Sequence, residues 1–179
     1  MKKLPVLPVL VALSVALVGC SPVTHLEAAP AAPDPVCARM LQRLPRTLAG
    51  LERISTDAQA TVAYGTAEYP ITIRCGIEPP PPTTDRCLAV SGENAKDDAG
   101  VDWINPEADS PLLPAHAPKD AWVFLTYGRS PALEVVVPAQ AGIDQPTGIL
   151  LALQGSAKVV PAQRACIGPT DVTAQQPAN

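Results

Sequence analysis

The chain has few of the residues and motifs on which most enzymes depend. Aromatic residues make up 3% of its 179 residues, and there are two histidines, His25 and His116. It contains no Gly-x-Ser-x-Gly elbow, no Walker loop, no Gly-x-Gly-x-x-Gly and no His-Glu-x-x-His. A Ser/His/Asp site would have to use His116, which lies in a Pro-rich stretch where a solvated side chain is the commoner outcome. We therefore expect a non-catalytic protein without cofactor or metal.

Positive charge is also scarce. The chain has 13 Lys and Arg against 17 Asp and Glu, for a formal net charge of −4. An acidic chain has no electrostatic basis for binding nucleic acid, and it lacks the basic cluster that attracts anionic lipid. Any attachment to a membrane would have to come from another feature of the sequence.

The first twenty residues contain a feature that predicts membrane attachment. Lys2 and Lys3 precede an uncharged run, residues 4–18, that is too short to span a bilayer stably, since a spanning helix needs about 20 apolar residues. The run ends in Gly19 and Cys20, the layout of a bacterial lipoprotein signal. We expect residues 1–19 to be a signal peptide and Cys20 to carry diacylglycerol and palmitate on the extracytoplasmic face of the cell membrane. The alternative is a chance cysteine after an ordinary signal peptide.

The four other cysteines, Cys37, Cys75, Cys87 and Cys166, are an even number in a chain predicted to be exported. That count favours two disulfides. Three pairings are possible, and we favour Cys37–Cys75 with Cys87–Cys166, because each bond then ties one end of the chain to its centre. No pair has the Cys-x-x-Cys spacing of a zinc or redox site.

Composition divides the remainder of the chain into three parts. Residues 20–34 are rich in Ala and Pro, which favours an extended tether that could hold a domain roughly 40 Å from the membrane. His25 lies in this tether and has no expected role. Residues 35–168 form the domain, and residues 169–179 form a frayed tail.

Within the domain, apolar periodicity predicts two helices and several strands. Asp34 caps the first helix, in which apolar residues recur at helical spacing as far as Leu44, and the second helix runs over 147–157. The expected strands are 51–55, 60–64, 71–75, 86–91, 101–104, 122–127 and 133–137. The prediction is an α+β fold: one antiparallel sheet with an N-terminal and a C-terminal helix packed on one face, held by two disulfides.

The order of several short motifs resembles a known family. A Cys-bearing helix ending at Leu44-Pro45 is followed by Arg74-Cys75-Gly76, Val101-Asp102-Trp103, Thr126-Tyr127-Gly128-Arg129, Val135-Val136-Val137-Pro138 and a terminal Cys166. This set is similar to the actinobacterial exported proteins of domain-of-unknown-function family 3515, over roughly residues 34–168. The family often has Trp-Gly where this chain has Tyr64-Gly65. The resemblance implies an actinobacterial envelope protein but no activity.

Two groups of residues suggest binding sites. The acidic residues Glu93, Asp97, Asp98 and Asp102 form a Gly-bounded stretch that would suit calcium, although a solvated hairpin is the commoner outcome. Arg74 and Arg129, with Trp103 and Trp122, suggest a patch for an anionic or glycan-like ligand. The alternative is that both indole rings lie in the core and that Arg129 pairs with a carbonyl or an acid.

Three functions remain open at this stage. The first is a membrane-tethered binding or scaffolding domain whose partner is an envelope protein or a wall component. The second is a small solute-binding or delivery lipoprotein. The third is a hydrolase that uses two carboxylates, for which Asp102 and Glu134 are candidates.

Overall fold

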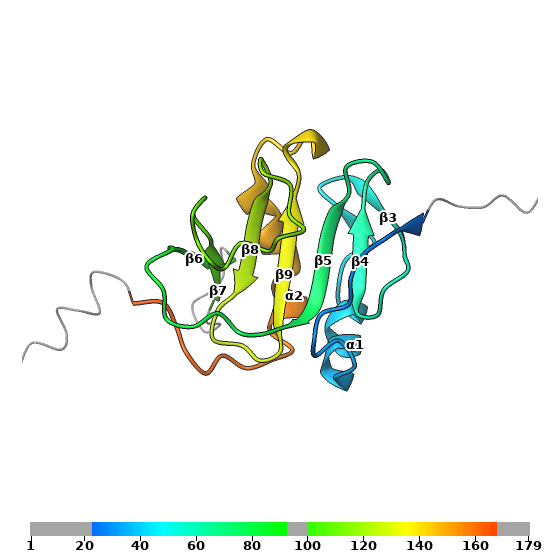
Figure 1. Ribbon diagram of the computed structural model, residues 1–179. Helices are drawn as coiled ribbons and strands as arrows, with labels where there is room; N and C mark the ends of the chain where they lie inside the picture. The colour runs from blue at the N-terminus through cyan, green and yellow to red at the C-terminus, as the bar shows by residue number, and fades with distance from the viewer. Residues whose placement is uncertain (1–22, 93–99, 168–179) are drawn as a thin grey trace, which may run out of the picture.

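A computed structural model describes residues 23–92 and 100–167. Its centre is one mostly antiparallel sheet in the order β1-β3-β4-β5-β9-β8-β7-β6, with β2 paired to β3 (Figure 1). The strands are β1 (Val23–Thr24), β2 (Thr47–Leu48), β3 (Leu51–Thr56), β4 (Thr61–Tyr64), β5 (Ile71–Ile77), β6 (Arg86–Val90), β7 (Val101–Asn105), β8 (Trp122–Thr126) and β9 (Ala132–Val137). All seven predicted strands are present, and β1 and β2 are additional.

The pairing of β5 with β9 joins the two halves of the sheet. Arg74 lies directly opposite Glu134, and Thr72 opposite Val136. The register shifts between Cys75 and Ile77, where Gly76 has a φ of +103°. Because this conformation is accessible chiefly to glycine, Gly76 fixes the position of the bulge.

Two helices accompany the sheet. Helix α1 (Pro35–Gln42) begins as predicted, with the Asp34 carboxylate accepting a hydrogen bond from the Val36 N–H at 2.8 Å. Helix α2 (Ile149–Ala157) follows the 3₁₀ turns η1 (Ala139–Ala141) and η2 (Pro146–Gly148), so it starts two residues later than predicted. The Ser156 hydroxyl donates to the Met40 carbonyl at 2.7 Å and links the two helices.

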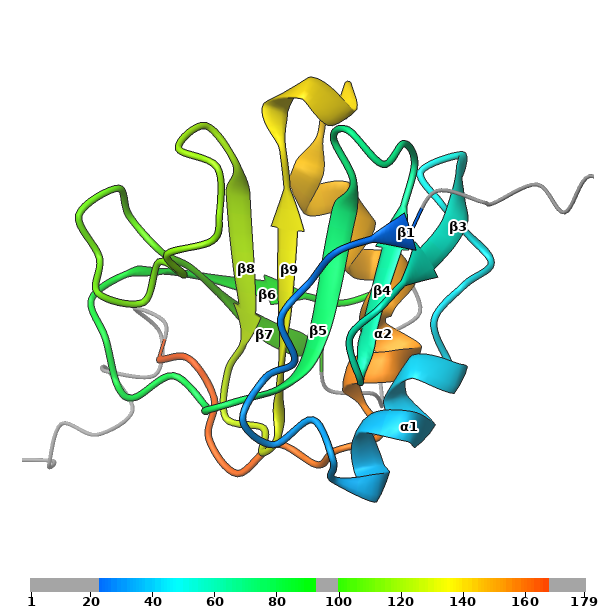
Figure 2. The same ribbon diagram turned by 45° about the vertical axis from the view of Figure 1, so that its right-hand side comes forward.

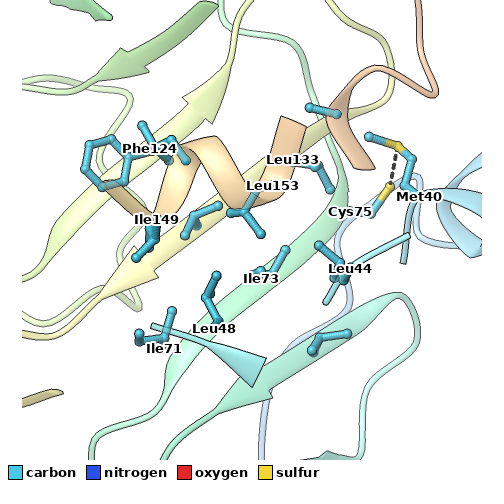
Figure 3. Close-up of a cluster of buried hydrophobic side chains, with 14 of the residues drawn as sticks. Met40, Leu44, Leu48, Ile71, Ile73, Cys75, Phe124, Leu133, Ile149 and Leu153 are labelled. Carbon is cyan, nitrogen blue, oxygen red and sulfur yellow. Dashed lines mark hydrogen bonds between the residues drawn. The ribbon is translucent and has the colours of Figure 1, made fainter. Parts of the chain in front are cut away.

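The main core is mostly aliphatic, although Tyr64, Trp103 and Phe124 are also fully buried in it. Side chains from α1, α2 and the alternate positions of β5 and β9 share one buried cluster, in which Ile73, Leu133, Leu150 and Leu153 are fully buried (Figure 3). A second, smaller cluster contains Ile104, Val123, Leu125 and Val136. The two clusters take alternating residues of β9, so the sheet separates them. The predicted α+β fold, with one mostly antiparallel sheet and two helices, is therefore confirmed.

The favoured disulfide pairing is also confirmed. Cys37 bonds to Cys75 with their Cα atoms 5.5 Å apart, and Cys87 bonds to Cys166 with a Cα separation of 6.4 Å. The first ties α1 to β5, where the Met40 sulfur lies 3.5 Å from that of Cys75 (Figure 3). The second connects β6 to the C-terminal segment.

The prediction of a free tether is wrong for residues 23–34, which we call the N-terminal strap. This strap crosses the sheet on the side away from α2 (Figure 2), and β1 pairs in parallel with β3. The Ala31 N–H donates to the Gly76 carbonyl at 2.9 Å, and Ala29 and Ala32 are buried. An alanine needs little space, so an Ala/Pro segment can lie flat against a strand as easily as it can extend into solvent. The strap therefore cannot serve as a 40 Å spacer.

Some predictions lie beyond the described ranges. These include the signal peptide at residues 1–19, Cys20 and the tail at 169–179. Of the helices in 23–92 and 100–167, none is long and apolar enough to traverse a bilayer.

Candidate functional site

A buried ionic cluster lies where the two halves of the sheet meet. The Arg74 guanidinium donates from Nε to Glu134 Oε1 at 2.6 Å and from Nη2 to Oε2 at 3.1 Å. His116 Nε2 lies 3.0 Å from the same Oε1. The Glu134 side chain is only 4% exposed and that of Arg74 11%. Their positions opposite one another on β5 and β9 make this two-pronged contact possible.

The environment keeps Glu134 ionised. Burial alone would raise the pKa of the Glu134 carboxyl, but hydrogen bonds from His116 and Arg74, together with their charges, outweigh it and lower that pKa. Both carboxylate oxygens have partners, so Glu134 is a fixed anion rather than a proton donor. It holds the guanidinium and the imidazole in place.

A cavity of about 580 Å³ opens beside this cluster. Arg74 and His116 are among its polar lining residues, and Thr72 and Val136 belong to its sheet wall. Most of the other lining is apolar, with Ala67, Pro70 and Pro138 among its members. A concave, mainly apolar site with a few convergent polar groups is the usual form of a small-molecule pocket, for which volumes of roughly 300–1,000 Å³ are typical.

The N-terminal strap forms another wall of this cavity. Residues 23–27 all line it, and the Glu27 carbonyl accepts a hydrogen bond from Arg74 Nη1 at 3.1 Å. The hydroxyl of Thr24 is buried there without a hydrogen-bond partner among the described residues. Such a group normally has a partner. A ligand group with a hydrogen-bonding oxygen would satisfy it.

The strap is held at its other edge by Asp57, just after β3. The Asp57 carboxylate accepts from the Leu26 N–H at 3.0 Å and contacts His25 Nδ1 at 2.5 Å. The backbone hydrogen bond from Leu26, followed by that with His25, lowers the pKa of Asp57. His25, for which we expected no role, therefore helps to attach the strap.

The predicted patch of Arg74, Trp103 and Arg129 does not exist as a surface. Trp103 is fully buried in the cluster that contains the helices, and Arg129 is 5% exposed and donates to the Val160 carbonyl. Arg74 faces the cavity described above. Trp122, by contrast, is 43% exposed and lies parallel to Phe124 rather than beside an arginine of the patch.

The acidic groups are also separated. Glu93, Asp97 and Asp98 lie outside the described residues, whereas Asp102 accepts a hydrogen bond from the Cys166 N–H at 2.8 Å. Asp102 lines a different cavity, beside Cys87 and Cys166, whose sulfur atoms are joined to each other. It therefore does not share a pocket with Glu134, as a pair of glycosidase carboxylates must.

Comparison with known proteins finds a family whose model matches the chain. No curated protein and no solved structure matches the chain. The model of the family described as "Protein of unknown function (DUF3515)" matches residues 3–162, which is most of the chain and includes the strap, the sheet and both helices. The chain therefore belongs to the DUF3515 family of proteins of unknown function.

Proposed function

We propose that this protein is a lipid-anchored, non-catalytic binding protein of the cell envelope. Its ligand is a small molecule that occupies the cavity between the N-terminal strap and the sheet. Of the functions open from the sequence, this choice favours solute binding or delivery over scaffolding. The observation that carries the proposal is the cavity of about 580 Å³ that Arg74 and His116 line, both of them held by the buried Glu134.

The construction of the cavity supports binding. Three parts of the chain far apart in sequence, the strap, β5 and the loop that contains His116, contribute to one site. Arg74 is fixed by two contacts to Glu134 and one to the Glu27 carbonyl, so it presents its remaining N–H groups in a set direction. Groups that are already oriented lose little entropy when a ligand arrives.

The same geometry argues against acid–base catalysis at this cluster. A general acid of a glycosidase needs a raised pKa, and burial of Glu134 is outweighed by its hydrogen-bond partners. The second carboxylate proposed from the sequence, Asp102, is in another cavity. We therefore do not retain the hydrolase hypothesis.

Native mass spectrometry of the lipidated protein, purified from its own membranes, tests the proposal. We expect one small molecule bound to the wild-type protein. Ala67 lines the cavity and is exposed in the β4–β5 turn, so Ala67→Trp would block the site without entering the core. Ala38→Trp, at an exposed position of α1, is the matched control and should retain the ligand. Absence of any bound molecule, or equal occupancy in both variants, would refute the proposal.

The anchor has its own test. Cys20→Ser removes the thiol to which diacylglycerol would be attached, and we expect the variant to leave the membrane fraction. Retention in the membrane would contradict the proposed anchoring while leaving the cavity proposal intact.

A further inference from the structure

We infer that the ligand is a membrane lipid with an uncharged head group, taken from the bilayer to which the protein itself is anchored. This inference rests on the proposed function, because it assumes both the anchor at Cys20 and a ligand in the cavity. It goes further by naming the chemical class of the ligand and the place from which it comes.

The first argument is the distance between the anchor and the cavity. Val23 lines the cavity, and only three residue steps separate it from Cys20. Each step spans at most about 3.6 Å, so the anchored residue lies within about 11 Å of Val23. Because the strap is fixed to the sheet by Asp57 and Gly76, the domain cannot move away from this point as it could on a free tether. The anchor therefore keeps the cavity beside the bilayer surface.

The second argument is the character of the rim. Val23 and Tyr69 both line the cavity and are 43% and 41% exposed. Among the described residues, few large apolar side chains are exposed to this extent, and Val23 and Tyr69 line the same cavity. Tyrosine is enriched at membrane interfaces, where its ring meets apolar groups and its hydroxyl meets water. A rim of this kind suits the entry of an acyl chain, which the apolar lining would then enclose.

The third argument is charge, which selects the head group. Among the described residues that line the cavity, Arg74 is the one arginine or lysine, and it is already paired with Glu134. Glu27 and Glu68 also line the cavity, and Asp57 lies behind the strap. Even with both histidines of the lining, His25 and His116, protonated, these carboxylates and Glu134 would outnumber the cations by four to three, which disfavours a phosphate or a carboxylate head. Two kinds of hydrogen-bonding group remain for a ligand. One is the Thr24 hydroxyl. The other is the N–H groups of Arg74 that do not contact Glu134 or Glu27, because a guanidinium has five N–H groups in all.

Hydroxyl and carbonyl oxygens match these groups. A glyceride or a glycolipid offers such oxygens next to an acyl chain, whereas an anionic phospholipid adds a charge that the site cannot neutralise. We accordingly expect diacylglycerol to bind and phosphatidylglycerol to be rejected.

Uptake from vesicles tests the ligand class. The full-length lipidated protein is reconstituted into phosphatidylcholine vesicles that contain either diacylglycerol or phosphatidylglycerol, and bound lipid is measured by native mass spectrometry after extraction. We expect a diacylglycerol adduct on the wild-type protein and on Ala38→Trp, and a loss of at least about tenfold in affinity for Ala67→Trp, equivalent to 1.4 kcal/mol. An equal phosphatidylglycerol adduct, or no effect of Ala67→Trp, would overturn the inference.

Fluorescence quenching by lipids labelled in the head-group region tests the location independently of any ligand. The described ends of the chain lie on opposite sides of the domain (Figure 1), and Ile167 is 77% exposed at the far end. We expect Tyr69→Trp to be quenched and Ile167→Trp not to be, each after subtraction of the signal of the native tryptophans. Equal quenching at both positions would overturn the membrane-proximal position.

The outcomes separate this inference from the proposed function. If the protein from native membranes carries only a water-soluble molecule that Ala67→Trp displaces, the binding function stands and the lipid inference is wrong. If no molecule is bound under any condition, both are wrong.

Discussion

Breaking the buried pair of Arg74 and Glu134 gives the most informative prediction about the energetics of the fold. Among the described residues, the Glu134 carboxylate, which is 4% exposed, has three side-chain contacts; Arg74→Met removes two of them and leaves that with His116 at 3.0 Å. Removing one partner of a buried ion pair costs roughly 3–5 kcal/mol. Because His116 remains as a partner, we expect a cost near the lower limit, about 3 kcal/mol.

Urea unfolding with the disulfides intact measures this cost. For an m-value of about 2 kcal/mol per M, a loss of 3 kcal/mol lowers the unfolding midpoint by about 1.5 M. The double variant Arg74→Met with Glu134→Leu replaces the pair by apolar side chains of similar volume, and we expect it to lie within about 1 kcal/mol of the wild type. Additive losses in the double variant, or a loss below about 1 kcal/mol for Arg74→Met, would refute the view that the two residues act as one unit.

The same pair predicts how stability depends on pH. The folded state lowers the pKa of Glu134, so the stability that this residue contributes is present above its unfolded pKa of about 4.3. It is lost as the pH falls through that value toward the lower pKa of the folded state. Glu134→Gln has no such titration, so the difference in stability between it and the wild type should shrink below about pH 4. A difference that stays constant with pH in this window would show that Glu134 is not held ionised.

Two further predictions concern the covalent and backbone links of the strap region. Replacing Cys37 and Cys75 together by alanine opens a loop with a sequence separation of 38, and we expect a loss of roughly 4 kcal/mol in the free energy of urea unfolding; a loss under about 1 kcal/mol would contradict this. Gly76→Ala would place a Cβ atom 2.4 Å from the Ala32 backbone nitrogen at a φ of +103°, so limited proteolysis should cut the strap much faster than in the wild type. Gly142→Ala, at a φ of +70° with open space around it, is the control for backbone strain alone and should leave the strap protected.

The sequence was sufficient for most of the fold because the relevant signals are local. Asp34 before Pro35 predicts the start of α1, and the run at 133–137, with its three consecutive valines, predicts β9. The positions of the four cysteines along the chain favour the disulfide pairing that is found, out of three possible pairings. The helix and strand predictions depend on neighbouring residues. The disulfide prediction depends on the expectation that each bond ties one end of the chain to its centre.

The site could not be predicted because its contacts join distant residues. Glu134 lies between Leu133 and Val135, and alternation alone suggests a solvent-facing carboxylate rather than one that is 4% exposed. Its partner Arg74 is 60 positions away, and only the register of β5 with β9 brings the two together. The interpretation of residues 23–34 as part of a tether failed for a related reason. Composition describes what an Ala/Pro segment does in water, but not that Gly76 and Asp57 offer it backbone partners.

Hydrogen exchange of the N-terminal strap tests the central claim most directly, because the cavity and its closeness to the anchor both depend on the strap. The Leu26 and Ala31 N–H groups donate to Asp57 and to Gly76 respectively. We predict that these two amides exchange slowly, at rates like those of the sheet. Exchange of both at the rate of a free peptide would mean that residues 23–34 are a tether after all, and that the cavity lacks its outer wall.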